Sequence, residues 1–89
     1  MIKLIWDKGF KKSYKKKISN STSLKRNFWN AVNKFNENPF DKSLRTHKLS
    51  GELKECWAFS INYEYRIIFE FIDDNTISLI DIGTHDEVY

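Results

Sequence analysis

Apolar residues recur with helical spacing in the first half of this chain and alternate with polar residues in the second half. In the first half, Phe10, Tyr14 and Ile18 follow one another at every fourth position. They come just after Asp7, a residue type that is favoured at helix N-caps. This pattern predicts an amphipathic helix, and the apolar run at residues 2–6 before it predicts a short strand.

The next apolar residues are again spaced for one helix face: Leu24, Phe28, Ala31, Val32 and Phe35. The polar segment 20–23 before them offers several N-cap residues, and Pro39 after them stops a helix near residue 38. Two consecutive helices joined by such a short polar turn predict a helical hairpin.

Three alternating segments predict strands over residues 56–61, 65–72 and 76–83, with a tight turn at 73–75 between the last two. In the middle strand Arg66 lies on the face opposite the large apolar side chains, where it either pairs with a neighbouring glutamate or binds a ligand. An irregular basic segment, residues 40–54, precedes these strands.

The predicted order of elements is β-α-α-β-β-β, which describes an α+β fold. We expect a helical hairpin packed on one face of a small, mostly antiparallel sheet, with the other face partly open. The chain has 89 residues, of which 40% are apolar and 16% aromatic, enough for one small core without covalent cross-links. We therefore expect a single domain over residues 1–89.

Cysteine usage and the first residues indicate the cellular compartment. Cys56 is the only cysteine, so no disulfide can form within the chain. The first residues contain no apolar run long enough for a signal peptide or a membrane span. A soluble protein of the reducing cytoplasm is the expected class.

Charge is distributed unevenly along the chain. Residues 1–54 hold 14 of the 15 Lys and Arg residues and four of the 12 acidic residues, a balance of +10. Residues 55–89 hold Arg66 and eight acidic residues, a balance of −7. The basic half predicts an interaction with a polyanion such as RNA or with an acidic protein partner, and the alternative is an ordinary solvated helix surface.

The last seven residues, Gly83-Thr84-His85-Asp86-Glu87-Val88-Tyr89, carry the most informative chemistry. They follow a predicted strand, so His85 and Tyr89 are expected to be held by ordered structure. Histidine gives and takes protons near neutral pH without special tuning. Asp81 has the same strand parity as His85, so it either orients that imidazole or is simply solvated.

Three segments together resemble a known family: His47-Lys48-Leu49-Ser50-Gly51, then Cys56-Trp57 through Tyr65-Arg66-Ile67-Ile68-Phe69, and the ending from Ile82 to Tyr89. In this order and spacing, the chain resembles the RelE/ParE superfamily of type II toxin–antitoxin toxins, most closely the RelE-like and YafQ-like mRNA interferases. The resemblance implies a toxin that is neutralised by a cognate antitoxin and that cuts mRNA in the decoding site of the ribosome. It implies contact with promoter DNA only through the antitoxin.

The resemblance also implies site residues. His85 and His47 match histidines of YafQ-like enzymes, and Arg66 and Tyr89 match an arginine and a tyrosine of RelE-like toxins. We expect His85 and His47 to serve as complementary acid and base, Arg66 to hold the phosphate, and Tyr89 to stack on a base or assist proton transfer. Further expected contacts to RNA phosphates come from five basic residues: Arg45, Lys48, Lys54, Lys12 and Lys16.

No metal or cofactor is expected, because His47, Cys56 and His85 lack a zinc-site spacing and no Gly-rich phosphate loop is present. The chain departs from the family pattern at three positions. Ser60 stands where YafQ-like enzymes have a histidine, Glu64 where they have an aspartate, and Asp81 where the ribonucleases usually have an arginine. Two alternatives therefore stay open: a ParE-like toxin that poisons gyrase by binding, and a catalytically degenerate homologue that binds only an antitoxin.

Overall fold

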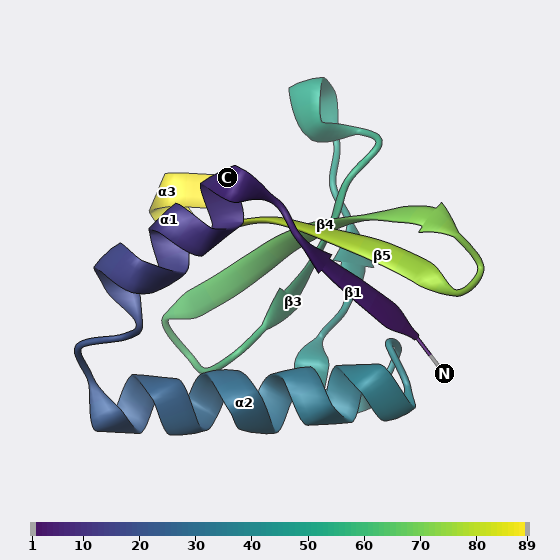
Figure 1. The fold of residues 1–89 in the computed structure, drawn as a ribbon. Helices are drawn as coiled ribbons and strands as arrows, with labels where there is room; N and C mark the ends of the chain where they lie inside the picture. The colour runs from purple at the N-terminus through teal and green to yellow at the C-terminus, as the bar shows by residue number, and fades with distance from the viewer. Residues whose placement is uncertain (1, 89) are drawn as a thin grey trace.

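The computed structural model describes residues 2–88, which form a five-stranded mixed sheet with two long helices against one face (Figure 1). The strand order is β1-β5-β4-β3-β2, in which β1 is parallel to β5 and all other neighbours are antiparallel. This arrangement confirms the predicted α+β class. The elements in chain order are β1 (Lys3–Trp6), α1 (Lys8–Lys17), α2 (Thr22–Glu37), the 3₁₀ turn η1 (Lys42–Leu44), β2 (His47–Lys48), the 3₁₀ turn η2 (Gly51–Leu53), β3 (Trp57–Ser60), β4 (Tyr65–Asp73), β5 (Thr76–Thr84) and α3 (His85–Val88).

The two long helices begin and end close to their predicted boundaries. Ser21 is the N-cap of α2, and its hydroxyl accepts a hydrogen bond from the amide of Leu24 at 3.2 Å. Asp7 occupies the N-cap position of α1, but its side chain makes no capping hydrogen bond, so the expected cap is only positional. The backbone amide of Asp7 instead donates to Leu79 at 3.1 Å, which ties the start of α1 to the sheet.

Both helices bury their apolar faces in one core on the same side of the sheet. Phe35 of α2 stacks on Phe59 of β3 with ring centroids 4.3 Å apart and meets Phe69 of β4 edge-on at 4.9 Å. The rings of Tyr14 and Phe28 lie 4.8 Å apart and join α1 to α2. The alternating residues predicted to face the helices are therefore the ones that do so.

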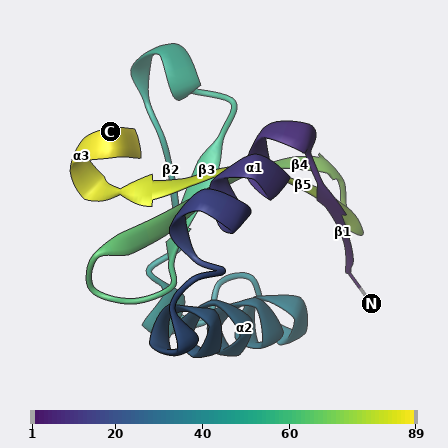
Figure 2. The same cartoon turned by 60° about the vertical axis from the view of Figure 1, so that its left-hand side comes forward.

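The opposite face of the sheet is more covered than expected. A second apolar cluster, built from Leu49, Cys56, Ala58 and Ile68, lies there, with Ile80 packed against it. β2 forms the edge of the sheet next to β3, and η2, which follows it, stands clear of the sheet (Figures 1 and 2). Burial raises the pKa of the Cys56 thiol, and nearby Glu70 adds to the effect, so this thiol is a neutral packing group.

One edge of β5 is covered by a helix where its partner strand ends. β1 pairs with β5 only as far as Leu79, so the later backbone groups of β5 need other partners. Lys17 of α1 donates to the carbonyl oxygen of Ile82 at 2.8 Å, and Ser13 donates to the carboxylate of Asp81 at 2.6 Å. Helix α1 thus replaces a strand along this edge.

The end of β5 before His85 overturns the expected parity of Asp81 and His85. Ile68 and Phe69 are neighbours on β4, but they pair with Asp81 and Leu79, which are two residues apart on β5. The register therefore shifts by one residue at this point of β5. Asp81 is held by α1, and His85 belongs to the helical turn α3 instead of the strand. The bulge comes before Asp81, and the change from strand to helix between Thr84 and His85 ends the alternation that would relate the two side chains.

Two short elements, β2 and α3, were not predicted. The strand has two residues and the helix four, too few for either period to appear in a sequence. Within residues 2–88, the helices are all too short or too polar to cross a membrane.

Replacing Phe35 by alanine should lower the free energy of unfolding by about 3–5 kcal/mol, because it removes the ring between Phe59 and Phe69. Urea denaturation followed by circular dichroism measures the change. Phe35→Leu should cost less, and Asn33→Ala, at an exposed position of the same helix, should change little. A loss equal to that of Asn33→Ala would contradict this account of the core.

Candidate functional site

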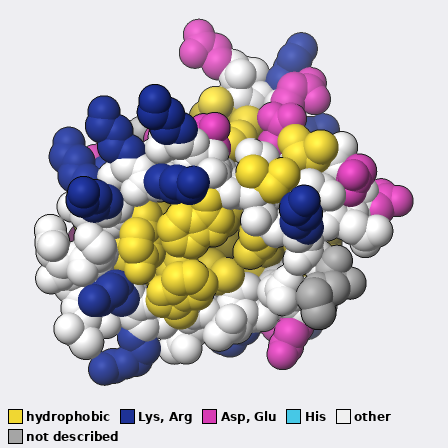
Figure 3. Space-filling view, in the orientation of Figure 1, with side chains coloured by type: hydrophobic (Ala, Val, Ile, Leu, Met, Phe, Trp, Pro, Cys, Tyr) yellow, Lys and Arg dark blue, Asp and Glu magenta, His cyan; other side chains and the backbone are white. Residues whose placement is uncertain are grey.

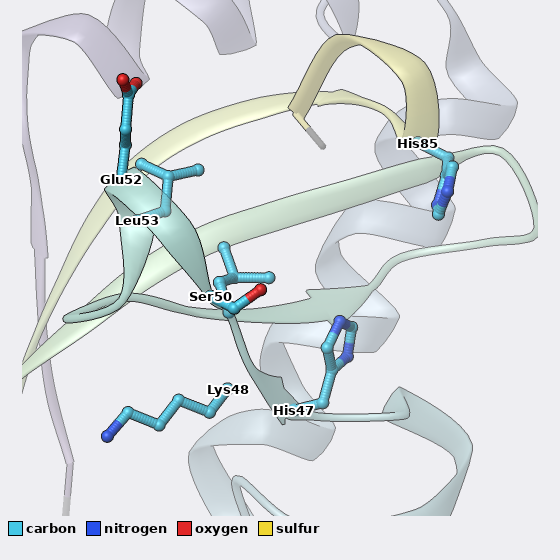
Figure 4. A pocket seen from close by; sticks show the side chains of 7 residues that line it. His47, Lys48, Ser50, Glu52, Leu53 and His85 are labelled. Atoms are coloured by element: carbon cyan, nitrogen blue, oxygen red, sulfur yellow. The ribbon is translucent and has the colours of Figure 1, made fainter.

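A pocket of about 540 Å³ opens beside β2 and η2 and brings the two histidines of the chain together. Its described lining consists of His47, Lys48, Leu49, Ser50, Glu52, Leu53 and His85. In Figure 4 the imidazoles of His47 and His85 point toward one another across the opening, whereas the side chain of Lys48 extends away from them. The site therefore has two exposed proton-transfer groups that face a common space.

The tautomer of His47 follows from its hydrogen bond to the backbone. Its Nδ1 lies 2.9 Å from the carbonyl oxygen of Arg45, and because a carbonyl only accepts, Nδ1 carries the proton. In the neutral ring the basic nitrogen is then Nε2. Arg45 itself has a φ of 53°, an uncommon left-handed conformation for a residue with a side chain.

His85 is held by a reciprocal cap at the start of α3. The amide of Thr84 donates to Glu87 Oε1 at 2.8 Å, and the amide of Glu87 donates to Thr84 Oγ1 at 3.3 Å. Lys17 reaches the same carboxylate oxygen at 3.4 Å. The Thr84 amide hydrogen bond, with a smaller contribution from Lys17, lowers the pKa of the Glu87 carboxyl from its ordinary value of 4.5. This cap turns the chain sharply after β5 and presents His85 on the pocket side.

Arg66 does not line the histidine pocket. Its Nη1 donates to the carbonyl oxygens of Asn62, Tyr63 and Tyr65 at 3.0, 3.2 and 3.2 Å. It lines a second pocket of about 210 Å³, together with Arg45. Among the described residues, Lys17 and Glu87 form the one side-chain ion pair, and Arg66 takes part in none. The alternative in which Arg66 pairs with a neighbouring glutamate is therefore wrong.

Strand register nevertheless places Arg66 on the same face of the sheet as His47. His47 pairs with Ala58, and Ala58 pairs with Ile68, so these three side chains share one face. Arg66 lies two residues before Ile68 on the same strand and therefore shares that face. Its partners on the neighbouring strands are Ser60 and Gly83. From His47 to Arg66 the backbone therefore spans about 10 Å across two strands and about 7 Å along them. Gly83, the partner of Arg66 on β5, comes two residues before His85, which lies beyond the last paired residue, Thr84.

The other predicted residues are distributed over the surface. Arg45 joins Arg66 in the second pocket, Lys54 is exposed just after η2, and Lys12 and Lys16 are exposed on α1, away from either pocket. Tyr89 lies outside the described residues, so its predicted role stays a prediction. Ser50, Glu52 and Leu53 line the histidine pocket and were not predicted as site residues, although Ser50 belongs to the segment that carried the family resemblance.

Within residues 2–88, no three His, Cys, Asp or Glu side chains lie close enough together to hold a metal ion. The chemistry that the described site supports is proton transfer between two imidazoles, next to a sheet face that carries arginines.

The fold is shared with several solved bacterial toxins. A copper-bound mutant toxin from Helicobacter pylori is 22% identical, with a TM-score of 0.79 over 100% of both chains. A YoeB/ParE toxin from Agrobacterium tumefaciens is 16% identical, with a TM-score of 0.77 over 94% of this chain and 99% of the other. YafQ in the DinJ–YafQ complex from E. coli is 16% identical, with a TM-score of 0.72 over 100% of this chain and 99% of the other. No curated protein matches the sequence.

Together with the match to a family model, this fold identifies the class of protein as the RelE superfamily of toxins from type II toxin–antitoxin systems. Within that class, the family model described as "Bacterial toxin of type II toxin-antitoxin system, YafQ" matches residues 2–89. The chain belongs to this YafQ toxin family.

The cap on α3 should weaken as the pH falls. Because the pKa of Glu87 is lowered in the folded chain, its stabilising effect is complete above 4.5 and is lost as the pH falls through the lower folded value. The amide chemical shifts and hydrogen exchange of Thr84 and Glu87, measured by NMR from neutral pH downward, should report this loss.

Glu87→Gln should remove the transition, because an amide retains a weak cap but does not titrate. Asp86→Asn, which changes the neighbouring exposed acid, is the matched control and should retain it. An unchanged transition in Glu87→Gln would show that another group is responsible.

Proposed function

We propose that this toxin is a metal-independent endoribonuclease that cleaves mRNA on the ribosome and so inhibits translation. The observation that supports it most directly is the pair of imidazoles, His47 and His85, that face each other across one pocket (Figure 4). Cleavage of RNA at a ribose 2′-OH needs one group that accepts a proton and one that donates a proton. Two histidines on a shared opening meet this requirement without a metal.

The hydrogen bond of His47 suggests how the two roles are divided. Neutral His47, with its proton on Nδ1, takes the 2′-OH proton on Nε2 while the 2′ oxygen attacks phosphorus. The bond from phosphorus to the 5′ oxygen breaks, and protonated His85 gives its proton to that leaving oxygen. The product is a 2′,3′-cyclic phosphate. Reversal of the two roles lets water open it to a 3′-phosphate.

Arg66 supplies the fixed positive charge in this proposal. Its side chain lies on the same face of the sheet as His47, and its partner on β5, Gly83, comes two residues before His85. Nη1 is anchored to two loop carbonyls and to that of Tyr65 at the start of β4, so the rest of the guanidinium is held in place and can donate to the charge that develops on the phosphate. Lysines of α1, including Lys12 and Lys16, add a basic surface that suits ribosomal RNA.

The structure weakens one argument for a degenerate homologue. Asp81 was a concern because a carboxylate in the site would repel phosphate. Its Oδ1 instead accepts hydrogen bonds from Ser13 of α1 at 2.6 Å and from the amide of Ile82 at 2.8 Å. The carboxylate is thus directed toward α1 and does not line the histidine pocket.

Replacement of either histidine by glutamine should reduce cleavage by about 10²–10⁴-fold, the usual contribution of one acid or base. Primer extension on an mRNA in a translating extract measures the rate. The double variant should be little worse than the poorer single variant, because acid and base act in one step.

Lys25→Gln, at an exposed position of α2, is the control and should leave the rate unchanged. Undiminished translation arrest by both histidine variants would exclude this mechanism. If gyrase supercoiling were then inhibited, a ParE-like activity would replace it.

We propose a second surface for the cognate antitoxin. On the face seen in Figure 3, apolar side chains gather between α1 and α2, with Lys and Arg side chains around them. Trp29 of α2, which is 46% exposed, stacks on Trp6 of β1 at 6.0 Å, and Trp6 meets Tyr14 of α1 at 5.2 Å. An exposed aromatic cluster of this kind is typical of protein interfaces.

Charge indicates the kind of antitoxin segment that fits. Exposed lysines of α1 surround the aromatic cluster, so an amphipathic segment with acidic residues beside its apolar ones would be complementary. Similar toxins have been solved as the DinJ–YafQ and YoeB–YefM complexes, which supports an antitoxin as the partner. A ribosome-directed toxin with such a partner acts in the cytoplasm.

Trp29→Ala should weaken antitoxin binding roughly 5- to 30-fold, because it removes an exposed aromatic anchor. Isothermal titration calorimetry measures the affinity, and mRNA cleavage without antitoxin should stay at the wild-type rate. Ile72→Ala is the matched control, since Ile72 is 55% exposed outside this cluster. Equal affinities for the two variants would remove the aromatic cluster from the interface.

A further inference from the structure

The second pocket has the composition of an anion site. Its volume is about 210 Å³, and its described lining consists of Ser43, Arg45, Ser60, Ile61, Asn62, Tyr63 and Arg66. Two arginines contribute positive charge, and the lining contains no carboxylate. Ser60 lies directly opposite Arg66 on the neighbouring strand and also lines the pocket.

Two carboxylates lie near this pocket in the sequence: Glu64, next to Tyr63, is not among the described lining residues, and Asp41 is already hydrogen-bonded. Asp41 Oδ1 accepts hydrogen bonds from the amide and the hydroxyl of Ser43 at 2.9 and 2.6 Å. The Ser43 hydroxyl hydrogen bond, followed by the amide and by Lys34, holds the pKa of the Asp41 carboxyl below its ordinary range. Asp41 therefore acts as the cap of η1, leaving the arginines to bind another anion.

Tyr63 adds an aromatic surface at the mouth of the pocket. It is 95% exposed, more than any other large apolar or aromatic side chain that the structure describes. The loop that carries it is ordered by Asn62, whose side-chain oxygen accepts from the amides of Glu64 and Tyr65 at 2.9 and 2.7 Å. Arg66 Nη1 binds the Tyr63 carbonyl oxygen at 3.2 Å. The loop thus presents the ring to solvent without packing it.

Arg45 connects this pocket to the histidine pocket. Its carbonyl oxygen accepts the Nδ1 proton of His47, while its side chain lines the second pocket. Arg45 is the C-cap of η1 and has the left-handed φ of 53° that is common at such positions. Arg45 is therefore in contact with His47 of the first pocket through its backbone and lines the second pocket itself.

We propose that Arg45, Arg66 and Tyr63 form a subsite for the nucleotide next to the cleaved bond, with Arg66 at the cleaved phosphate, Arg45 at the neighbouring phosphate and the base stacked on the Tyr63 ring. This inference rests on the proposed nuclease function and extends it. Guanidinium groups bind phosphate through paired hydrogen bonds, and aromatic rings stack on single-stranded bases with little sequence preference. The nucleotide comes from the message or from ribosomal RNA, which share this chemistry.

Binding of a short single-stranded RNA with 2′-O-methyl riboses, which cannot be cleaved, tests the subsite without relying on catalysis. In NMR titrations of the folded protein, the amides of Arg45, Ser60 and Tyr63 should shift. Tyr63→Ala should weaken binding roughly 5- to 100-fold, as expected for the loss of one stacked base. Tyr63→Phe should stay within about twofold, because it retains the stacking face.

Two matched variants control for general effects. Phe40→Ala removes another exposed aromatic ring, 55% exposed, and Arg26→Gln removes an exposed arginine of α2. Both should bind RNA like wild type, whereas Arg45→Gln should weaken it. If Tyr63→Ala bound the RNA as tightly as Phe40→Ala does, the proposal would be overturned. It would also be overturned if Tyr63→Ala lost affinity for the antitoxin while its affinity for RNA stayed unchanged.

A second arm identifies the source of the nucleotide. Cleavage of a translated message is compared between wild type and Tyr63→Ala, with and without an abasic residue beside the cleaved bond. A Tyr63 effect that disappears with the abasic message indicates a message nucleotide, and an effect that persists indicates ribosomal RNA. If the histidine variants still cleave but the oligonucleotide shifts remain, the nuclease mechanism fails while the RNA subsite stands.

Discussion

The contact between α1 and the open edge of β5 is the constraint on which the site depends. Strand β1 stops pairing at Leu79, and Lys17 then satisfies the carbonyl of Ile82 while also attracting Glu87. Glu87 caps α3 and so fixes the direction in which the chain leaves the sheet. The carbonyl of Ile82, which needs a hydrogen-bond partner at the sheet edge, is thereby linked through Lys17 and Glu87 to Thr84. Because His85 follows Thr84, these contacts also set the orientation of His85.

The second histidine is positioned by an independent device on the other side of the pocket. β2 is too short to be stable alone, and it is held by pairing with β3 and by the small cluster around Leu49 and Ile68. Arg45 then supplies the carbonyl that sets the tautomer of His47. Since the two histidines depend on different parts of the fold, the chemistry between them relies on the rigid sheet that joins both parts.

Much of the fold follows from the sequence because its determinants are local. Spacing of apolar residues defined α1, α2, β3, β4 and β5 close to their observed bounds, and Ser21 was among the caps expected for α2. The helical face of the sheet was also correct, since alternation fixes which side chains share a face. The resemblance to RelE-like and YafQ-like toxins identified the family and drew attention to both histidines.

The sequence by itself therefore determined the elements, their faces and the two imidazoles. Only the tertiary structure decided that these imidazoles share a pocket, that Arg66 lines a different one with Arg45, and that Asp81 turns to α1. Each of these outcomes depends on hydrogen bonds between residues far apart in the chain, such as Ser13 with Asp81. A bulge in β5 also shifts the register after Leu79, and no periodic pattern reveals a single inserted residue.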